Sequence, residues 1–192
     1  MELQLALTQA LDAHKEGILN FSKDLIRIPS ENPPGNYYRE CADRIRLELE
    51  RLELPYQLVE VPGFSDRPRC NLLSFYGEGE RTLYFHGHYD VVPAQSREQF
   101  GPRVDKGRLF GRGSTDMKSA LAETIETVIG ARPSFEMCPG ILETRWYARK
   151  GIPAFAYGPG FLEVAHGPSE FIEIERIYQH TLIYALAAAR LL

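Results

Sequence analysis

Apolar residues recur at helical spacing in three long segments of the chain, two near the N-terminus and one at the C-terminus. Residues 3–28 carry the first pattern, with a period of about 3.6 residues, and Pro29 ends it because a residue before proline avoids the helical region. Residues 37–52 carry the second pattern, with apolar side chains along one face. Residues 174–191 carry the third, which is strongly apolar. The sequence therefore predicts three amphipathic helices.

A shorter periodicity marks the predicted strands. Residues 56–61 alternate between apolar and polar positions, which is typical of a half-buried strand. Residues 70–76 form a second candidate, and the glycine-containing turn after them predicts a hairpin into a third strand at 82–86. This third strand is apolar on both sides, as expected of a central strand covered by helices. Residues 153–157 show the same buried type of pattern.

The remaining segments complete an alternation of helices and strands. Residues 91–110 are predicted to be mostly loop, 117–129 and 142–150 to be helices, and 135–138 to be a short strand. Alternation of this kind predicts an α/β fold, a layered sheet with helices on both faces. With no interdomain linker in its 192 residues, the chain is predicted to form a single domain.

Composition and charge exclude several classes of partner. The chain is 44% hydrophobic and 25% charged, with a net charge of −4 and both signs interspersed. No basic stripe predicts nucleic-acid binding, and no apolar run approaches the ~20 residues of a membrane helix. The three cysteines lie far apart without a Cys-x-x-Cys pair, which favours a reducing compartment such as the cytoplasm.

Candidate chemistry gathers around the third predicted strand and the glycine-rich segment after it. His88 and Asp90 are two residues apart, so a strand would point both side chains to one face. His88 can then bind a metal while Asp90 orients it or its bound water. Asp116 follows the glycine-rich turn at 111–115, and His166 lies in a later loop. The sequence therefore offers a set of imidazole and carboxylate ligands.

Each candidate also has a structural interpretation. A lone histidine such as His86 is more often packed than functional, and Asp116 by itself would most often cap a helix. Arg145 by default lies on a solvated helix face, and Cys138 by default is a small buried residue. There is no Gly-x-Ser-x-Gly motif, which argues against a serine hydrolase.

Taken together, these segments resemble a family of co-catalytic zinc amidohydrolases. That family includes acetylornithine deacetylase, succinyl-diaminopimelate desuccinylase, aminoacylase and glutamate carboxypeptidase. The segments that carry the resemblance are 26–30 (IRIPS), 32–35 (NPPG), 86–93 (HGHYDVVP), 111–118 (GRGSTDMK), 151–153 (GIP), 157–160 (YGPG) and 165–166 (AH).

The resemblance implies a role for each candidate residue. His88 would bind one metal, His166 a second, and Asp116 would bridge the two, with a cis peptide bond after it. Asp90 would be the catalytic aspartate behind His88, and Arg145 would lie near the substrate carboxylate. The implied cofactor is zinc, as one or two ions, with cobalt or manganese as substitutes. The implied substrates are small N-acyl amino acids or peptides, and the protein would be a monomer or a weak homo-oligomer.

The chain also departs from the family pattern. The family has a long segment between the positions of Asp116 and His166. That segment contains an adjacent acidic pair, of which one acid is the general base and the other a metal ligand, as well as a further acidic ligand and a separate lid domain. Here the two residues are only 50 positions apart, and no two acidic residues are adjacent anywhere in the chain. The sequence therefore resembles a catalytic domain without its middle segment, with an internal junction near 129–135. The nearest acids after Asp116 are Glu123 and Glu126.

Three function classes follow from this comparison. The motifs favour a metal-dependent hydrolase of amide bonds in N-acyl amino acids or peptides. The missing acids favour a metal-binding but catalytically impaired remnant, or an engineered scaffold, without the general-base glutamate. A non-catalytic interaction domain is the third class. Because three ligands are the minimum for a catalytic zinc site, His88, Asp116 and His166 gathered on one ion form a further hypothesis.

Overall fold

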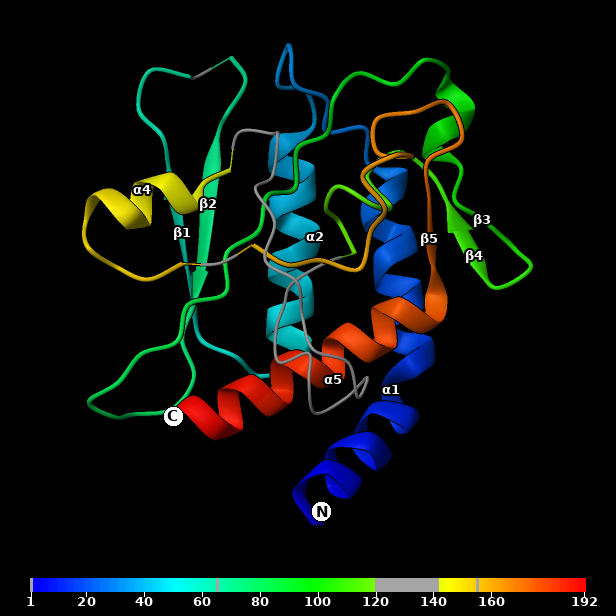
Figure 1. The fold of residues 1–192 in the computed structure, drawn as a ribbon. Helices are drawn as coiled ribbons and strands as arrows, with labels where there is room; N and C mark the ends of the chain where they lie inside the picture. Colours follow the sequence, from blue (N-terminus) through cyan, green and yellow to red (C-terminus); the bar gives the residue numbers. More distant parts are fainter. Residues whose placement is uncertain (1, 65, 120–141, 155) are drawn as a thin grey trace.

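The computed structural model describes residues 2–64, 66–119, 142–154 and 156–192 (Figure 1). The helices are α1 (Glu2–Arg27), α2 (Tyr38–Arg51), the 3-10 turn η1 (Arg97–Phe100), α4 (Thr144–Arg149) and α5 (Ile174–Leu191). The strands are β1 (Tyr56–Glu60), β2 (Cys70–Ser74), β3 (Arg103–Asp105), β4 (Arg108–Phe110) and β5 (Phe171–Glu173).

The predicted helices at 3–28, 37–52, 142–150 and 174–191 are confirmed as α1, α2, α4 and α5. The predicted helix 117–129 lies outside the described residues apart from 117–119, which form a turn. The predicted strand 135–138 and the predicted junction near 129–135 also lie outside them. None of the described helices combines the length and the apolar character that a membrane crossing requires.

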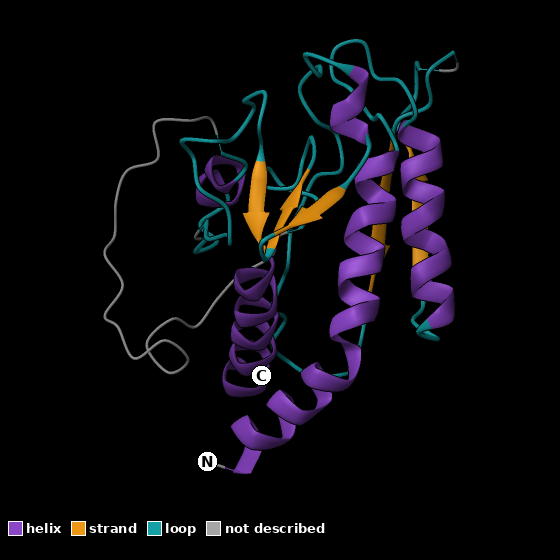
Figure 2. Ribbon diagram, turned by 90° about the vertical axis from the view of Figure 1, so that its right-hand side faces the viewer, coloured by secondary structure: helices purple, strands orange, loops and turns teal. Residues whose placement is uncertain are grey.

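The described strands form two small antiparallel sheets. β1 pairs with β2, in register from Tyr56 opposite Ser74 to Glu60 opposite Cys70, and α2 packs against β2. β4 lies between β3 and β5. Figure 2 shows α1 and α2 side by side in front of β1 and β2. The α/β class is therefore confirmed, but these five strands do not form the single layered sheet that was predicted.

The difference arises at residues 82–86, which were predicted to form the central strand of the sheet. Residues 82–86 have no strand partner among the described residues, and the side chains of Tyr84 and Phe85 are 66% and 45% exposed. Described residues of 153–157 are likewise not in a strand. An apolar run shows that a segment favours an extended conformation, but it carries no information about which strand would pair with it. These two strand predictions are wrong for the described residues.

The predicted loop 91–110 contains structure that the hydrophobic pattern missed. The turn between β3 and β4 places Lys106 at φ 46° and Gly107 at φ 75°, the pair of left-handed residues of a tight hairpin. The strands on either side have three residues each, too few to establish a period of two. β5 continues this sheet and leads directly into α5.

A small core joins this sheet to the two long helices at either end of the chain. Ile26 of α1, Leu109 of β4, Ile172 of β5 and Ile177 of α5 are at most 2% exposed and form one cluster. The cluster fixes the ends of β4 and β5, which lead into the glycine-rich turn at 111–115 and out of the loop that carries His166.

This core supports a matched stability test. Replacing Leu109, which is 0% exposed, by alanine is expected to lower the free energy of unfolding by about 2–5 kcal/mol. The same substitution at Leu73, a strand leucine that is 43% exposed, is expected to cost much less. Urea unfolding of both variants gives the two values, and equal losses would mean that this cluster is not the core.

Candidate metal centre

The segment that carries His88 is held by the loop after α1. The Ser30 hydroxyl donates to the carbonyl oxygen of Tyr89 at 2.6 Å, and the Val91 N–H donates to the carbonyl of Ser30 at 2.9 Å. The Asn32 N–H then donates to the carbonyl of Val91 at 2.8 Å. These bonds, rather than a strand ladder, place His88 and Asp90 on the same side of the segment.

Both ring nitrogens of His88 face carboxylates. Nδ1 lies 3.1 Å from Oδ1 of Asp90, and Nε2 lies 3.1 Å from Oδ1 of Asp116. The second oxygen of Asp90 accepts a hydrogen bond of 2.9 Å from the side-chain amide of Asn32. Asp90 thus lies behind His88, and the imidazole directs Nε2 toward Asp116.

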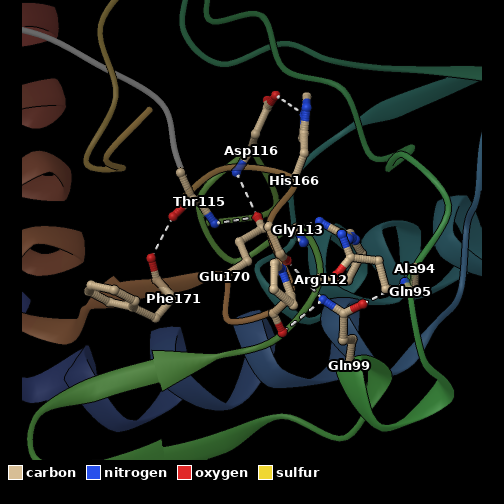
Figure 3. A network of polar contacts seen from close by, with 12 residues as sticks. Ala94, Gln95, Gln99, Arg112, Gly113, Thr115, Asp116, His166, Glu170 and Phe171 are labelled. Atoms are coloured by element: carbon tan, nitrogen blue, oxygen red, sulfur yellow. Dashed lines mark hydrogen bonds and ion pairs between the residues drawn. The ribbon is translucent and has the colours of Figure 1, made fainter. Parts of the chain in front are cut away.

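Asp116 joins the two candidate histidines. Its Oδ1 faces His88, while its Oδ2 lies 2.9 Å from Nε2 of His166 (Figure 3). The peptide bond between Asp116 and Met117 is cis, as the family resemblance implies. The structure therefore brings His88, Asp116 and His166 together. His88 does not follow a strand among the described residues, so the strand predicted at 82–86 is not what positions it.

Glu170 fixes the turn that carries Asp116. Its side chain is 0% exposed, and Oε1 accepts hydrogen bonds from the backbone N–H groups of Gly113, Thr115 and Asp116 at 3.0, 3.0 and 3.3 Å. Oε2 accepts a bond of 2.8 Å from Nη1 of Arg112, which is 1% exposed. Figure 3 shows Glu170 in the middle of this network.

The turn also depends on close approach of backbone atoms. Gly113 has a φ of 84°, and a Cβ at this position would lie 2.6 Å from Cγ1 of Val91. Any larger residue would clash with the segment that carries His88 and would strain the backbone. The glycine therefore allows the Asp116 turn and the His88 segment to touch.

Sequence reasoning missed the parts played by Asn32 and Glu170. Asn32 lies in the NPPG segment and Glu170 lies four residues after His166, so both stand within or beside the stretches that carry the resemblance. The hydrogen-bond partner of the Asn32 side chain is 58 positions away along the chain, and those of the Glu170 side chain are 54 to 58 positions away. Pattern analysis detects local spacing, so it could locate these residues but not pair them.

Arg145 lies on the exposed side of α4, with its guanidinium 5.0 Å from the centre of the Trp146 ring. The same helix contacts the candidate centre's segment through Tyr147, whose ring centre is 5.9 Å from that of His86. Within the described parts of the chain, no hydrogen bond or ion pair joins Arg145 to His88, Asp116 or His166. A role for Arg145 near a substrate carboxylate stays a prediction.

The carboxylates control the charge of His88. Burial alone would lower the pKa of His88, but its hydrogen bonds to Asp116 and Asp90 outweigh burial and raise the pKa to about 10. The hydrogen bond from His88 correspondingly lowers the pKa of Asp116 and of Asp90. Without metal the centre is therefore a hydrogen-bonded row of one imidazolium and two carboxylates.

The donor types at this centre fit zinc, which binds imidazole nitrogen and carboxylate oxygen. Within the described parts of the chain, the number of donors is smaller than a complete site needs. Among the described residues, no group of three or more histidine, cysteine, aspartate or glutamate side chains is arranged to hold one ion. Because each imidazole faces a different oxygen of Asp116, the geometry favours a bridging carboxylate over the hypothesis of three ligands on one ion.

Comparison with known proteins agrees with the motifs. Residues 84–135 match the sequence model of Peptidase family M20/M25/M40. The family resemblance is confirmed. The matched residues 84–135 include His88, Asp90 and Asp116, whereas Arg145 and His166 lie beyond them.

A curated relative extends the similarity. The succinyl-diaminopimelate desuccinylase of Buchnera aphidicola subsp. Baizongia pistaciae (strain Bp) is 37% identical to this chain over 116 residues. The alignment covers 58% of this chain and 28% of the relative, so the chain matches less than a third of that protein's length. What the relative's name says of its activity therefore enters only as a proposal for this chain.

The buried pair of Glu170 and Arg112 supports a stability prediction. Glu170→Gln is expected to lower the free energy of unfolding by about 3–5 kcal/mol, because it leaves the Arg112 charge buried without its counter-charge. Glu173→Gln, three residues further on in β5, is the matched control, since Glu173 pairs with Arg108 at 3.5 Å on the surface and such pairs contribute at most about 1 kcal/mol. Equal losses in urea unfolding would contradict a special role for Glu170.

The raised pKa of His88 predicts a pH dependence in chelator-treated protein. The folded chain holds the His88 proton more tightly than the ordinary value of 6.5 allows, up to a pKa of about 10. The resulting stabilisation is complete below pH 6.5 and is lost as the pH rises toward 10. The difference in melting temperature between wild type and His88→Gln should shrink across this range, with exposed His14→Gln as the control. A constant difference would contradict the pairing.

Proposed function

We propose that this chain carries the metal-binding part of a hydrolase that cleaves amide bonds in N-acyl amino acids or small peptides. The observation that supports the proposal most directly is the carboxylate of Asp116 between the Nε2 atoms of His88 and His166. Similarity of residues 84–135 to the M20/M25/M40 peptidases supports the reaction class. We also propose that the chain has the fold expected of the family's catalytic domain, a layered sheet with helices on both faces.

His88, Asp116 and His166 would hold zinc. When bound, zinc supplies a water of pKa about 7 and polarises the carbonyl of the amide. Asp90 keeps a proton on Nδ1 of His88, which leaves Nε2 as the coordinating atom, and Asn32 fixes the orientation of Asp90. Arg145 is proposed to bind the carboxylate of the substrate. The relative's name makes N-succinyl compounds a class to test beside N-acetyl compounds.

A second candidate function has its own supporting observation. In the described parts of the chain, Asp90 and Asp116 are the carboxylates in contact with the two imidazoles, and all four of their oxygens already face His88, Asn32 or His166. Neither is free to carry a proton from water to the leaving amine. Glu123 and Glu126 lie outside the described residues. This arrangement favours a protein that binds zinc but hydrolyses amides poorly.

Zinc titration with a substrate panel separates these functions. Calorimetry is expected to show zinc binding by wild type, with affinity reduced at least ~10-fold in His88→Ala and His166→Ala and unchanged in His14→Ala, because only the first two remove a ligand. Release of amino acid from N-acetyl and N-succinyl substrates is expected to be slower than in a complete family member by a factor of ~10²–10⁴, because the described residues place no free carboxylate at the centre to act as the base.

The possible results lead to different conclusions. No zinc binding by wild type would show that the proposed metal centre is wrong. Zinc binding without any hydrolysis would favour the second candidate function. Turnover as fast as that of a complete family member would show that a base is present after all.

A further inference from the structure

Gln99, at the end of η1, contacts the loop that carries His166. Its side-chain Nε2 donates to the carbonyl oxygens of Gly167 and Pro168 at 3.0 and 3.3 Å. These are the two residues directly after His166. Gln99 is half-buried and is 68 positions away from Gly167 in the sequence, so the contact joins two separate parts of the chain.

The other end of the same amide is equally well defined. Oε1 accepts hydrogen bonds from the backbone N–H groups of Gln95 and Ser96 at 2.7 and 3.3 Å. Since two donors surround the oxygen and two carbonyls surround the nitrogen, the partners fix which end of the amide is which. The main-chain carbonyl of Gln99 also accepts a bond of 2.8 Å from the N–H of Arg112. Gln99 therefore connects η1, the Asp116 turn and the His166 loop.

The His166 loop requires such a hold. His166 has a φ of 64°, a left-handed conformation that non-glycine residues adopt uncommonly and that persists only where the surroundings enforce it. The His166 side chain is 51% exposed, so packing alone does not fix it. On one side, Glu170 holds the loop through its buried carboxylate. On the other side, the hold on Gly167 and Pro168 comes from Gln99.

We propose that Gln99 is a positioning residue that keeps His166 in reach of Asp116, so that both can hold the same metal centre. The expected effect of Gln99 on zinc binding rests on the proposed function, whereas the contact of Gln99 with the His166 loop does not. Gln99 itself contacts neither ring of the candidate histidines. Its effect is transmitted through the backbone of Gly167 and Pro168.

Glutamate at position 99 isolates the proposed contact. Gln99→Glu keeps an acceptor for the N–H groups of Gln95 and Ser96, but it replaces the donor to the loop by an oxygen that repels the carbonyls of Gly167 and Pro168. Gln95→Glu adds the same charge four residues away on an exposed side chain and serves as the control. Gln99→Met, which removes both ends of the amide without adding charge, separates loss of the bond from repulsion.

Two measurements on the full chain test the proposal. In chelator-treated protein, amide hydrogen exchange across residues 164–170 is expected to be faster in Gln99→Glu and Gln99→Met than in wild type and Gln95→Glu. Exchange in α2 should stay unchanged. Zinc affinity measured by calorimetry is expected to fall ~10-fold in both Gln99 variants, as is typical when a residue that orients a ligand is removed, and to stay at the wild-type value in Gln95→Glu.

The two measurements distinguish failure of this proposal from failure of the proposed function. If exchange across 164–170 is the same in all four proteins, Gln99 does not hold the loop and the proposal is overturned. If wild type binds zinc, affinities of the Gln99 variants equal to that of Gln95→Glu would also overturn it. If wild type binds no zinc while exchange rises as expected, the hold on the loop is supported and the proposed function fails.

Discussion

The buried carboxylate of Glu170 is the constraint on which the candidate centre depends. It is fully removed from solvent, yet it accepts four hydrogen bonds, three from the backbone of residues 113–116 and one from Arg112. A carboxylate in this position is stable only while these donors surround it, because an unpaired buried charge costs several kcal/mol. These bonds therefore hold the Asp116 turn in its observed conformation, which directs the Asp116 side chain toward the two histidines.

The same residue ties two distant segments into one unit. Glu170 directly precedes β5, whose pairing with β4 brings residues 166–170 beside the turn that begins at Gly111, and the Gly111 N–H donates to the Glu170 carbonyl at 3.0 Å. The apolar core beneath, with Leu109 and Ile172 both 0% exposed, keeps the two strands in register. Burial of apolar surface thus keeps β4 and β5 paired. The pairing places the buried charge of Glu170 beside the Asp116 turn, and this in turn positions His166.

The sequence predicted the helices and the candidate residues more successfully than it predicted the sheet. Long helices such as α1 and α5 repeat their pattern over many turns, so local spacing suffices to find them. Strands β3 to β5 have three residues each, and their partners are set by contacts between distant residues. His88, Asp116 and His166 were found because glycine-rich and histidine-containing motifs are specific. The structural role of Glu170 was not found, because it comes from partners more than 50 positions away.

The geometry also separates two properties that the family resemblance joins. Binding a metal requires donors that converge, and here two imidazoles converge on one carboxylate. Hydrolysis requires in addition a carboxylate that is free to accept a proton, at a distance that allows transfer. Asp90 and Asp116 both have their oxygens engaged by the groups that define the centre. The bonds that hold this centre together thus withdraw these two acids from proton transfer, so hydrolysis would depend on an acid outside this network.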